Sequence, residues 1–215
     1  MLRDELRARG IDAWHHYEPY PKDATAIYPE ICPENYLNAP RSIWWLLNKA
    51  DFPGQEMWAW ETGMGDHPLL TVDIIEPLWH ERGLARSGVS YWIGKGALDG
   101  SILPEGATEI HRGNYPNRRE LAEHVASLDY LISFDPFTAL NIEAAISGTP
   151  VLIHAPRNQW SRDDFEAHAW VRHGIAWSRE ELEAARQDVH LAADDYDRKR
   201  RQFALRIDNF IQTVA

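Results

Sequence analysis

The chain has 215 residues, 44% of them hydrophobic and 26% charged, which is enough for a globular core in one large or two small domains. Its 33 acidic and 22 basic residues leave a formal net charge of −11, which disfavours binding to nucleic acid or to an anionic membrane surface. The single cysteine, Cys32, excludes an internal disulfide and a multi-cysteine zinc site, and no apolar run is long enough to predict a membrane span.

The first eighty residues predict a small α/β domain. Residues 2–9 predict a helix that ends at Gly10. The charged residues within this segment distinguish it from a signal peptide, so we expect a cytoplasmic protein. Glu30 follows an expected strand, where it would face a cleft as a general base or acceptor contact; a simple turn residue is the alternative. The remaining expected elements are strands at 12–17, 24–29, 56–61 and 69–75 and a helix capped by Asn38 that buries Ile43, Trp44, Leu46 and Leu47.

The second half of the chain predicts parallel strands that alternate with helices. The pattern is interrupted near 77–88, so we expect domains at 1–80 and 81–198 and a final helix at 199–215 that is a candidate to cross back to the first domain. A capping box at 178–181 predicts the start of the helices that fill the end of the chain. The other expected elements are strands at 89–96, 107–112, 130–134 and 151–155 and helices at 117–127 and 138–147.

An acid, Asp135, stands at the end of an apolar strand, and a second acid, Glu143, follows in the next helix. Ligands of open parallel sheets bind beyond the carboxyl ends of strands, where helix N-termini present free N–H groups to a phosphate. Asp135 would accept hydroxyls of a sugar and Glu143 both hydroxyls of a ribose; the alternative is that Asp135 only caps the helix and Glu143 is a surface residue. The helix start that would bind the phosphate comprises Phe137, Thr138, Ala139 and Leu140.

A second expected strand ends in a lysine between two glycines, Gly94, Lys95 and Gly96. Glycines at this position let a diphosphate approach the backbone, and the lysine ammonium neutralises part of its charge. Together with the acid pair, this motif predicts a site for a nucleotide-sugar.

At these residues the chain resembles a known family. The segment "FDPFTALNIEAAISGTPVLI" is similar to the E-x7-E segment of GT-B glycosyltransferases of the family-four type, with Asp135 in place of the first glutamate and Glu143 as the second. The order from "YWIGKG" to "ATEIHRGNYPNRRELAEHVASLDYLISFDPF" follows that family's donor-binding domain, and the resemblance covers residues 24–155. It implies an α/β fold of two Rossmann-like domains facing a cleft, with the first domain reduced because the family's leading strand is missing.

The resemblance also implies roles for individual residues. Lys95 would bind the diphosphate, Glu143 the ribose and Asp135 the donor sugar. Arg112 and Tyr115, in the turn "HRGNY", fall where the family holds the base. Lys95 and Asp135 are the catalytic candidates of this domain. No metal or other cofactor is expected, because lysine and helix N–H groups take the charge of the leaving diphosphate.

We therefore expect a glycosyltransferase that transfers a sugar from a nucleotide-sugar donor with retention of configuration. The acceptor is a glycan, a lipid-linked sugar or a small molecule; a modified base in phage DNA is an alternative that the negative charge disfavours. A non-catalytic nucleotide-sugar-binding protein, a subunit of a glycosyltransferase complex and an epimerase are the alternative functions. An exposed sheet edge in the reduced first domain, with Trp44, Trp45, Trp58 and Trp60, predicts a homodimer unless the final helix covers that edge.

Overall fold

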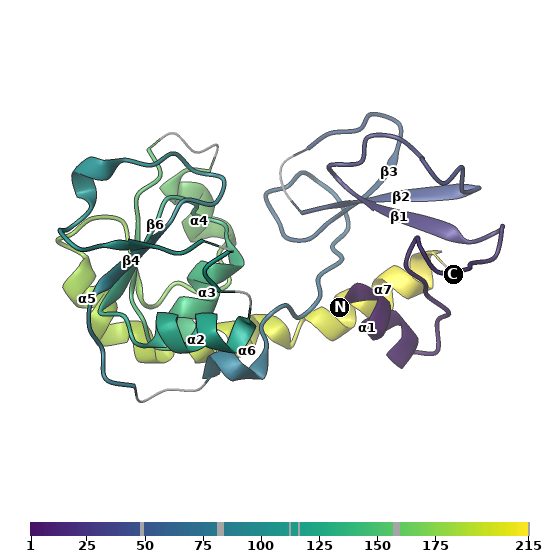
Figure 1. Ribbon diagram of the computed structural model, residues 1–215. Coiled ribbons are helices and arrows are strands. Elements are labelled where there is room, and N and C mark those ends of the chain that lie inside the picture. Colours follow the sequence, from purple (N-terminus) through teal and green to yellow (C-terminus); the bar gives the residue numbers. More distant parts are fainter. Residues whose placement is uncertain (48–49, 81–83, 112, 116, 157–159, 215) are drawn as a thin grey trace. The chain divides into compact units, whose positions relative to one another are not determined.

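The computed structural model describes residues 1–47, 50–80, 84–111, 113–115, 117–156 and 160–214. The chain divides into two compact units (Figure 1). The first unit comprises Met1–Ile74 and Arg200–Ala215, and the second comprises Ile75–Lys199. The division therefore follows Ile74, slightly before the interruption at 77–88, and the last helix belongs to the first unit although it is distant in sequence.

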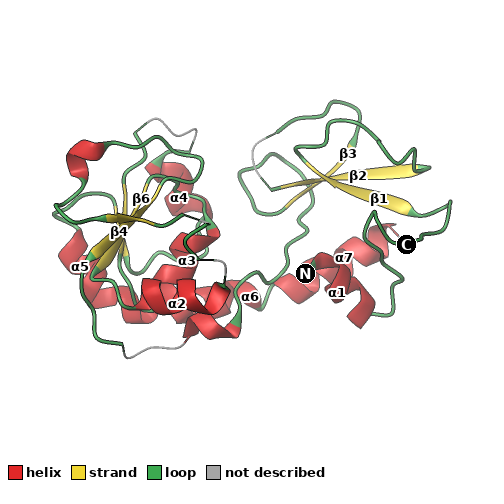
Figure 2. Cartoon of the chain, in the orientation of Figure 1, coloured by secondary structure: helices red, strands yellow, loops and turns green. Residues whose placement is uncertain are grey.

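The first unit is a three-stranded parallel sheet packed against a helix from each end of the chain. Its elements are α1 Leu2–Ala8, β1 Thr25–Pro29, β2 Arg41–Leu46, β3 Glu56–Ala59 and α7 Phe203–Val214 (Figure 2). The strands have the order β1-β2-β3, so neighbours in the sheet are neighbours in sequence. Leu6 of α1 and Ile207 and Phe210 of α7 share one core with Ile43 and Trp58 of the sheet. Each of these buried side chains stabilises the unit by about 1.5–3 kcal/mol.

The helix expected from Asn38 is wrong, because this segment forms the central strand β2. This strand pairs in parallel with β1 on one side and β3 on the other. Ile43, Trp44 and Leu46 are buried. A strand covered on both faces has apolar residues at consecutive positions, and a buried helix can show the same pattern, so the pattern alone does not distinguish the two. Asn38 adopts a φ of 50°, so it lies in a left-handed turn before the strand and caps no helix. Leu47, expected on the buried side, is exposed.

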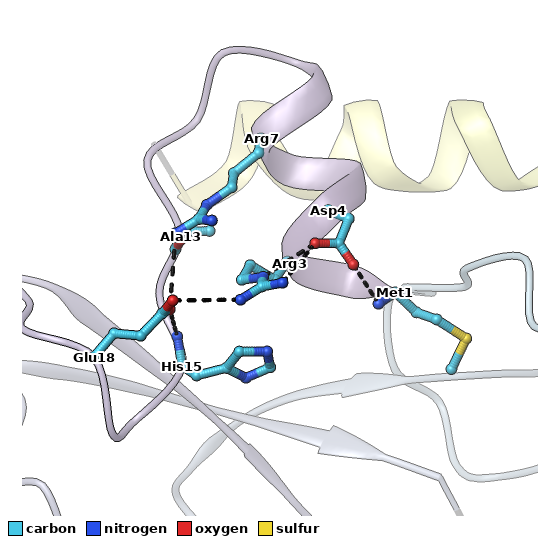
Figure 3. Close-up of polar contacts among 7 residues, drawn as sticks. All are labelled: Met1, Arg3, Asp4, Arg7, Ala13, His15 and Glu18. Carbon is cyan, nitrogen blue, oxygen red and sulfur yellow. Dashed lines mark hydrogen bonds and ion pairs between the residues drawn. The ribbon is translucent and has the colours of Figure 1, made fainter.

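The strand expected at 12–17 is also wrong, because these residues belong to a loop that side chains hold against α1. Figure 3 shows the Glu18 carboxylate at the centre of this contact, where it accepts the N–H of His15 and pairs with two arginines of α1. The His15 hydrogen bond contributes most to lowering the pKa of the Glu18 carboxyl below its usual range. Ile11 and Ala13 pack on the core from this loop, which explains why its apolar residues alternate as in a strand.

The strand expected at 69–75 is reduced to a single β-bridge between Leu69 and Ala59. Leu70 and Val72 are fully buried in the core of the first unit, so the apolar pattern correctly predicts burial. The segment is held at the bridge by the Leu70 N–H, which donates to the Ala59 carbonyl at 2.9 Å. Burial of an apolar segment thus did not imply that it extends the sheet.

The second unit is a five-stranded parallel sheet with helices on both faces. Its elements are β4 Val89–Trp92, β5 Thr108–Glu109, α2 Arg118–Ala126, β6 Tyr130–Ser133, α3 Ala139–Ile146, β7 Val151–Ile153, α4 Arg162–His168, β8 Ile175–Ala176, α5 Leu182–Asp188 and α6 Ala192–Arg200, with 3-10 helices at Pro77–His80, Gly100–Ile102 and Val189–Leu191. Ser90 of β4 hydrogen-bonds His124 of α2, whereas the next residue, Tyr91, packs against the hydrophobic cluster that contains Leu182 of α5. Because successive side chains of a strand point to opposite faces, α2 and α5 cover opposite faces of the sheet. All four residues of β6 are buried, as expected for a central parallel strand.

Most elements expected in the second unit are present, and both units are α/β with parallel sheets. The helix expected from residue 117 is present as α2, and Asn117 is its N-cap, because its side chain accepts the Arg119 N–H at 2.8 Å. The capping box at 178–181 is wrong: Glu181 itself is the N-cap of α5, and its carboxylate accepts the Trp177 N–H. Two elements, α4 and β8, were not expected, and the two residues of β8 are too few for a periodic pattern.

Candidate functional site

The order of strands in the second unit indicates where a ligand would bind. The strands lie in the order β5-β4-β6-β7-β8, so the chain moves outward from β4 to β5 and then returns to the other side of β4. Ligands of open parallel sheets bind beyond the carboxyl ends of the two strands at which the order reverses. Here those strands are β4 and β6, and the turns that follow them carry Gly94–Gly96 and Asp135. The topology therefore brings together the two segments that the sequence singled out.

Asp135 joins these two turns through its carboxylate. Oδ2 accepts the Lys95 N–H at 3.0 Å and Oδ1 accepts the Phe137 N–H at 3.3 Å, while only 7% of the residue is exposed. The Lys95 side chain is exposed beside it. Each carboxylate oxygen has a second lone pair that can accept a hydroxyl, so these hydrogen bonds are compatible with a role in ligand binding. The N-cap of α3 is Thr138, so the alternative that Asp135 caps this helix is wrong.

The two glycines beside Lys95 are required by packing within the protein. Gly94 has a φ of 56°, and a Cβ atom there would lie 2.6 Å from both Asp135 Oδ2 and Trp92 Nε1. A Cβ atom at Gly96 would lie 1.9 Å from the Phe134 carbonyl oxygen. The glycines thus allow the turn after β4 to contact the turn after β6. The role expected from the sequence, that these glycines let a diphosphate approach the backbone, stays a prediction.

The start of α3 completes this region. Thr138 is the N-cap of α3, and among the described residues its side chain makes no capping hydrogen bond. Asn141, in the first turn, is 2% exposed, and its Nδ2 donates to the carbonyls of Asp135 at 2.9 Å and Pro136 at 3.0 Å. Ser133 Oγ donates to the same Asp135 carbonyl at 2.9 Å. These hydrogen bonds fix the backbone between β6 and α3.

The side chains at 137–140 are largely occupied by packing. The Phe137 ring lies 4.3 Å from the ring of Trp160, measured between centroids, and Leu140 is buried. Ala139 is half-buried and offers no polar side-chain atom. Backbone N–H groups and the helix dipole are therefore what this segment can offer a phosphate, as the sequence predicted.

Glu143 lies further along α3 and is paired with Arg118, the first residue of α2. Its side chain is 3% exposed, so the alternative of a surface glutamate is wrong. Arg118 donates to Glu143 Oε1 at 2.5 Å, also pairs with Glu76, and lies over the ring of Trp79 at 5.4 Å. Burial raises the pKa of the Glu143 carboxyl above its ordinary value, and the charge and hydrogen bond of Arg118 offset only part of this effect. Arg118 occupies Oε1, so a ribose diol that uses both oxygens of Glu143 would compete with it.

Of the two residues expected to hold a base, only Tyr115 can be described, since Arg112 lies outside the described residues. The Tyr115 ring stacks on His124 of α2, with centroids 5.0 Å apart and an interplanar angle of 30°. Burial raises the pKa of the Tyr115 hydroxyl and lowers that of the His124 imidazole. Tyr115 therefore lies against the helix whose first residue is Arg118.

Glu30 lies in the first unit, after β1. Its Oε2 accepts the Leu47 N–H at 3.0 Å, and the residue is half-buried. This hydrogen bond joins the loops that follow β1 and β2. Such a contact is what a turn residue makes, and a catalytic role for Glu30 stays a prediction.

Sequence reasoning missed three residues of this region: Arg118, which pairs with Glu143, and Asn141 and Trp92, which border Asp135. Asn141 carried a cue, because asparagine inside a helix is unfavourable unless its amide has a local use. The position of Arg118 depends on how α2 packs beside α3, which no spacing along the chain reveals.

A histidine and an acid also pair at the same edge of the sheet. His154 directly follows β7, and its Nε2 lies 3.1 Å from Oδ2 of Asp99, in the segment that follows the lysine turn. The Ser101 hydroxyl and the Ser101 N–H, followed by His154, lower the pKa of the Asp99 carboxyl. The ring of His154 packs edge-on against Phe134, one residue before Asp135. The pair holds the segment after Lys95 against the sheet.

In the part of the chain that the structure describes, no group of three or more histidine, cysteine or acidic side chains is arranged to hold a metal ion. No helix in the same part is both long and apolar enough to cross a membrane. Comparison of the chain with protein-family models, with curated proteins and with solved structures found no match. A function is therefore inferred from the residues and their geometry.

Proposed function

We propose that the protein is a retaining glycosyltransferase that moves a sugar from a nucleotide-diphosphate sugar to an acceptor. The observation that carries this proposal is the hydrogen-bonded contact between Lys95 and Asp135 at the point where the strand order reverses. A lysine and a carboxylate at that point match the two parts of the donor, an anionic diphosphate and a polyhydroxylated sugar. The resemblance of residues 129–153 to family-four glycosyltransferases supports the same activity.

In this mechanism, the exposed ammonium of Lys95 and the N–H groups at the start of α3 bind the diphosphate. The bond between the sugar's anomeric carbon and the phosphate oxygen breaks, and the acceptor oxygen forms a bond to that carbon on the same face. Its proton passes to the departing diphosphate. Negative charge grows on the diphosphate as the first bond breaks, so Lys95 and the helix stabilise the transition state more than the ground state. Since these groups take the charge, the proposed reaction requires no metal ion.

Glu143 is the ribose-binding residue in this proposal, and Arg118 occupies its carboxylate when no ligand is bound. Two ribose hydroxyls can donate hydrogen bonds to one carboxylate as a guanidinium does, so the diol keeps the Glu143 oxygens hydrogen-bonded when Arg118 turns away. The Arg118 side chain is 48% exposed, which leaves it free to turn away from Glu143.

The proposal assigns the first unit to the acceptor in a GT-B arrangement of two Rossmann-like domains. Glu30, at the carboxyl end of β1, is then the residue that contacts the acceptor. The support for this assignment is the parallel α/β construction of both units, the first with three strands and the second with five. The acceptor classes are a glycan, a lipid-linked sugar or a small molecule.

An epimerase that acts on the same nucleotide-sugar is the second candidate, and the pair of His154 and Asp99 favours it. A histidine oriented by a carboxylate can move a proton from a sugar carbon or hydroxyl. Its position at the end of β7, the strand beside β6, lies on the same sheet edge as Asp135.

Calorimetric titration with UDP, GDP and ADP, followed by product analysis with the matching sugar nucleotides, tests these functions. The proposal expects one diphosphate to bind and its sugar nucleotide to release that diphosphate in the presence of pooled acceptors, with or without EDTA. A changed sugar that remains attached to the nucleotide would support the epimerase. Binding without turnover would support a non-catalytic nucleotide-sugar-binding protein, and the absence of any binding would contradict all three.

A further inference from the structure

Two polar atoms beside Asp135 are buried and lack a hydrogen-bond partner: Nε1 of Trp92 and Oδ1 of Asn141. The described residues contain four buried side-chain atoms of this kind, and two of the four border the same aspartate. Buried polar groups in native proteins are nearly always hydrogen-bonded, so such a pair indicates a place for a ligand or a water molecule.

The amide of Asn141 cannot turn over to satisfy its oxygen. Its Nδ2 donates to the carbonyl oxygens of both Asp135 and Pro136, at 2.9 and 3.0 Å. Exchange of the amide oxygen and nitrogen would place Oδ1 against two acceptors. Oδ1 is therefore fixed as an acceptor at the turn between β6 and α3.

Trp92 Nε1 is close to the same carboxylate. The Cβ atom that Gly94 lacks would lie 2.6 Å from Trp92 Nε1 and 2.6 Å from Asp135 Oδ2, so these two atoms are at most twice that distance apart. Gly94 is exposed, and the indole N–H therefore lies close beneath a stretch of bare backbone at the protein surface.

We propose that Trp92 Nε1 and Asn141 Oδ1, together with the Asp135 carboxylate, bind the hydroxyl groups of the transferred sugar and determine which sugar is accepted. This inference rests on the proposed function. One N–H donor and two acceptors suit a ring with several hydroxyls, because each hydroxyl both donates and accepts a hydrogen bond. A phosphate only accepts, so it would leave Asn141 Oδ1 unsatisfied and would be repelled by Asp135. The diphosphate accordingly binds at Lys95 and the sugar at these three groups.

Access to the two atoms requires a local displacement, because both are covered in the ligand-free protein. The exposed turn at Gly94 and Lys95 is the adjacent segment that can move, and its Lys95 N–H is joined to Asp135 Oδ2. Sugar hydroxyls that replace this arrangement regain hydrogen bonds for Trp92 and Asn141 that the ligand-free protein lacks.

Trp92→Phe removes the indole N–H and keeps an aromatic ring, so it tests the proposal. UDP-glucose, GDP-mannose and ADP-glucose serve as probes, each beside its sugar-free diphosphate. For the pair that the wild type binds, affinity for the sugar nucleotide should fall about two- to tenfold, the value of one hydrogen bond, while affinity for the diphosphate is unchanged. Since the lost N–H has no partner in the ligand-free protein, the melting temperature should stay the same or rise.

Trp45→Phe is the matched control. Trp45 and Trp92 are both half-buried, but Nε1 of Trp45 donates to the Leu70 carbonyl at 2.7 Å. This variant should lose thermal stability and keep its affinity for the sugar nucleotide. The two variants thus compare an indole N–H that stabilises the fold with one that is proposed to bind only the ligand.

The inference would be overturned by the following outcomes. Unchanged sugar-nucleotide affinity in Trp92→Phe means that Nε1 binds only buried water, and an equal loss for the diphosphate means that it contacts phosphate; both leave the proposed function standing. No binding to the wild type overturns the proposed function together with this inference. If Trp92→Phe does not fold, crystal structures of the wild type decide. Sugar hydroxyls at Nε1 and Oδ1 support the proposal, and the same water molecules with and without the sugar contradict it.

Discussion

The two units contain the same kind of sheet in two different orders. In the first unit, the parallel strands follow the sequence, β1-β2-β3, and the order never reverses. In the second unit, the order reverses at β4, so the connections after β4 and β6 leave in opposite directions. Crevices for ligands form at such reversals. A parallel sheet alone therefore does not predict a binding site, whereas a reversal of strand order does.

The acids at the strand ends differ in the same way. Glu30 in the first unit is half-buried and accepts the N–H of Leu47, which joins the loops of two consecutive strands. Asp135 in the second unit is buried, joins the turns on both sides of the reversal, and borders two polar atoms that lack partners. Both residues are carboxylic acids in the turn that follows a parallel strand. Their surroundings make only Asp135 a strong candidate for ligand binding.

The largest expected effect comes from adding a methyl group at the reversal. Gly96→Ala should destabilise the second unit by about 3 kcal/mol or more, because its Cβ atom would meet the rigid Phe134 carbonyl at 1.9 Å. Gly54→Ala is the control in the first unit, where φ is 79° and no atom lies within 4 Å of the added Cβ. It should cost about 1–2 kcal/mol through backbone strain alone. Urea denaturation of both variants measures the difference, and a smaller loss for Gly96→Ala would contradict the close contact of the two turns.

Lys95→Ala should lower turnover about a hundredfold while diphosphate affinity falls much less, because the diphosphate charge grows in the transition state. Lys22→Ala, at an exposed lysine of the first unit, should leave both quantities unchanged. Initial rates of diphosphate release at several donor concentrations measure kcat and KM separately. A Lys95→Ala variant with full kcat and only a raised KM would argue against a role in leaving-group stabilisation.

Arg118→Met should make the stability of the second unit depend more strongly on pH. The pKa of the buried Glu143 carboxyl is raised, so the folded state keeps this proton to higher pH than the unfolded chain does. Stability is therefore lost as pH rises from the ordinary glutamate value through the raised one. Removal of Arg118 raises this pKa further and enlarges the loss. By about pH 8 the variant should be about 1–3 kcal/mol less stable than the wild type. This loss is smaller than for a fully buried ion pair, because the Arg118 side chain is 48% exposed and solvent screens its charge.

The control for this prediction is the same change in a Glu143→Gln background. Without an ionisable group at that position, the effect of Arg118→Met should be equal at about pH 5 and about pH 8. Urea denaturation of the four proteins at both pH values gives the coupling energy. A pH dependence that persists in the Gln background would show that another group is responsible.

The smallest effect is expected in the first unit. Glu30→Gln keeps a carbonyl oxygen that can accept the Leu47 N–H, so stability should change by less than about 1 kcal/mol. If Glu30 only contacts the acceptor or the turn, turnover should fall by less than about tenfold. Rate measurements on this variant sharpen the comparison of the two units. A loss as large as that of Lys95→Ala would make Glu30 a catalytic residue and place part of the chemistry in the first unit.

Sequence patterns predicted the second unit better than the first for a physical reason. In the second unit, short apolar strands such as β6 and β7 are separated by helices with recognisable ends, including the Asn117 cap and the turn at Gly148 with a φ of 83°. In the first unit, the described connections between strands contain no helix. The alternation of strands and helices seen in the second unit therefore does not apply, and the apolar run of β2 is wrongly predicted as a helix.

The same distinction applies to the candidate site. Lys95 and Asp135 could be predicted to lie at the same edge of the sheet, because each lies in the turn that follows a parallel strand. The pairing of Glu143 with Arg118 could not, because it depends on the packing of α2 beside α3. The unpartnered atoms of Trp92 and Asn141 could not either, since only the finished fold determines which polar groups find partners.

The most direct test of ligand binding at the reversal is a nuclear magnetic resonance titration of the isotope-labelled protein with the nucleoside diphosphate that calorimetry identifies. Binding at the ends of β4 and β6 predicts shifts of the backbone amide signals at 94–96 and 137–143. The amide of Leu47, which hydrogen-bonds Glu30 in the first unit, should not shift. Saturation of the protein without shifts at 94–96 and 137–143, or with shifts confined to the first unit, would contradict the assignment of the site.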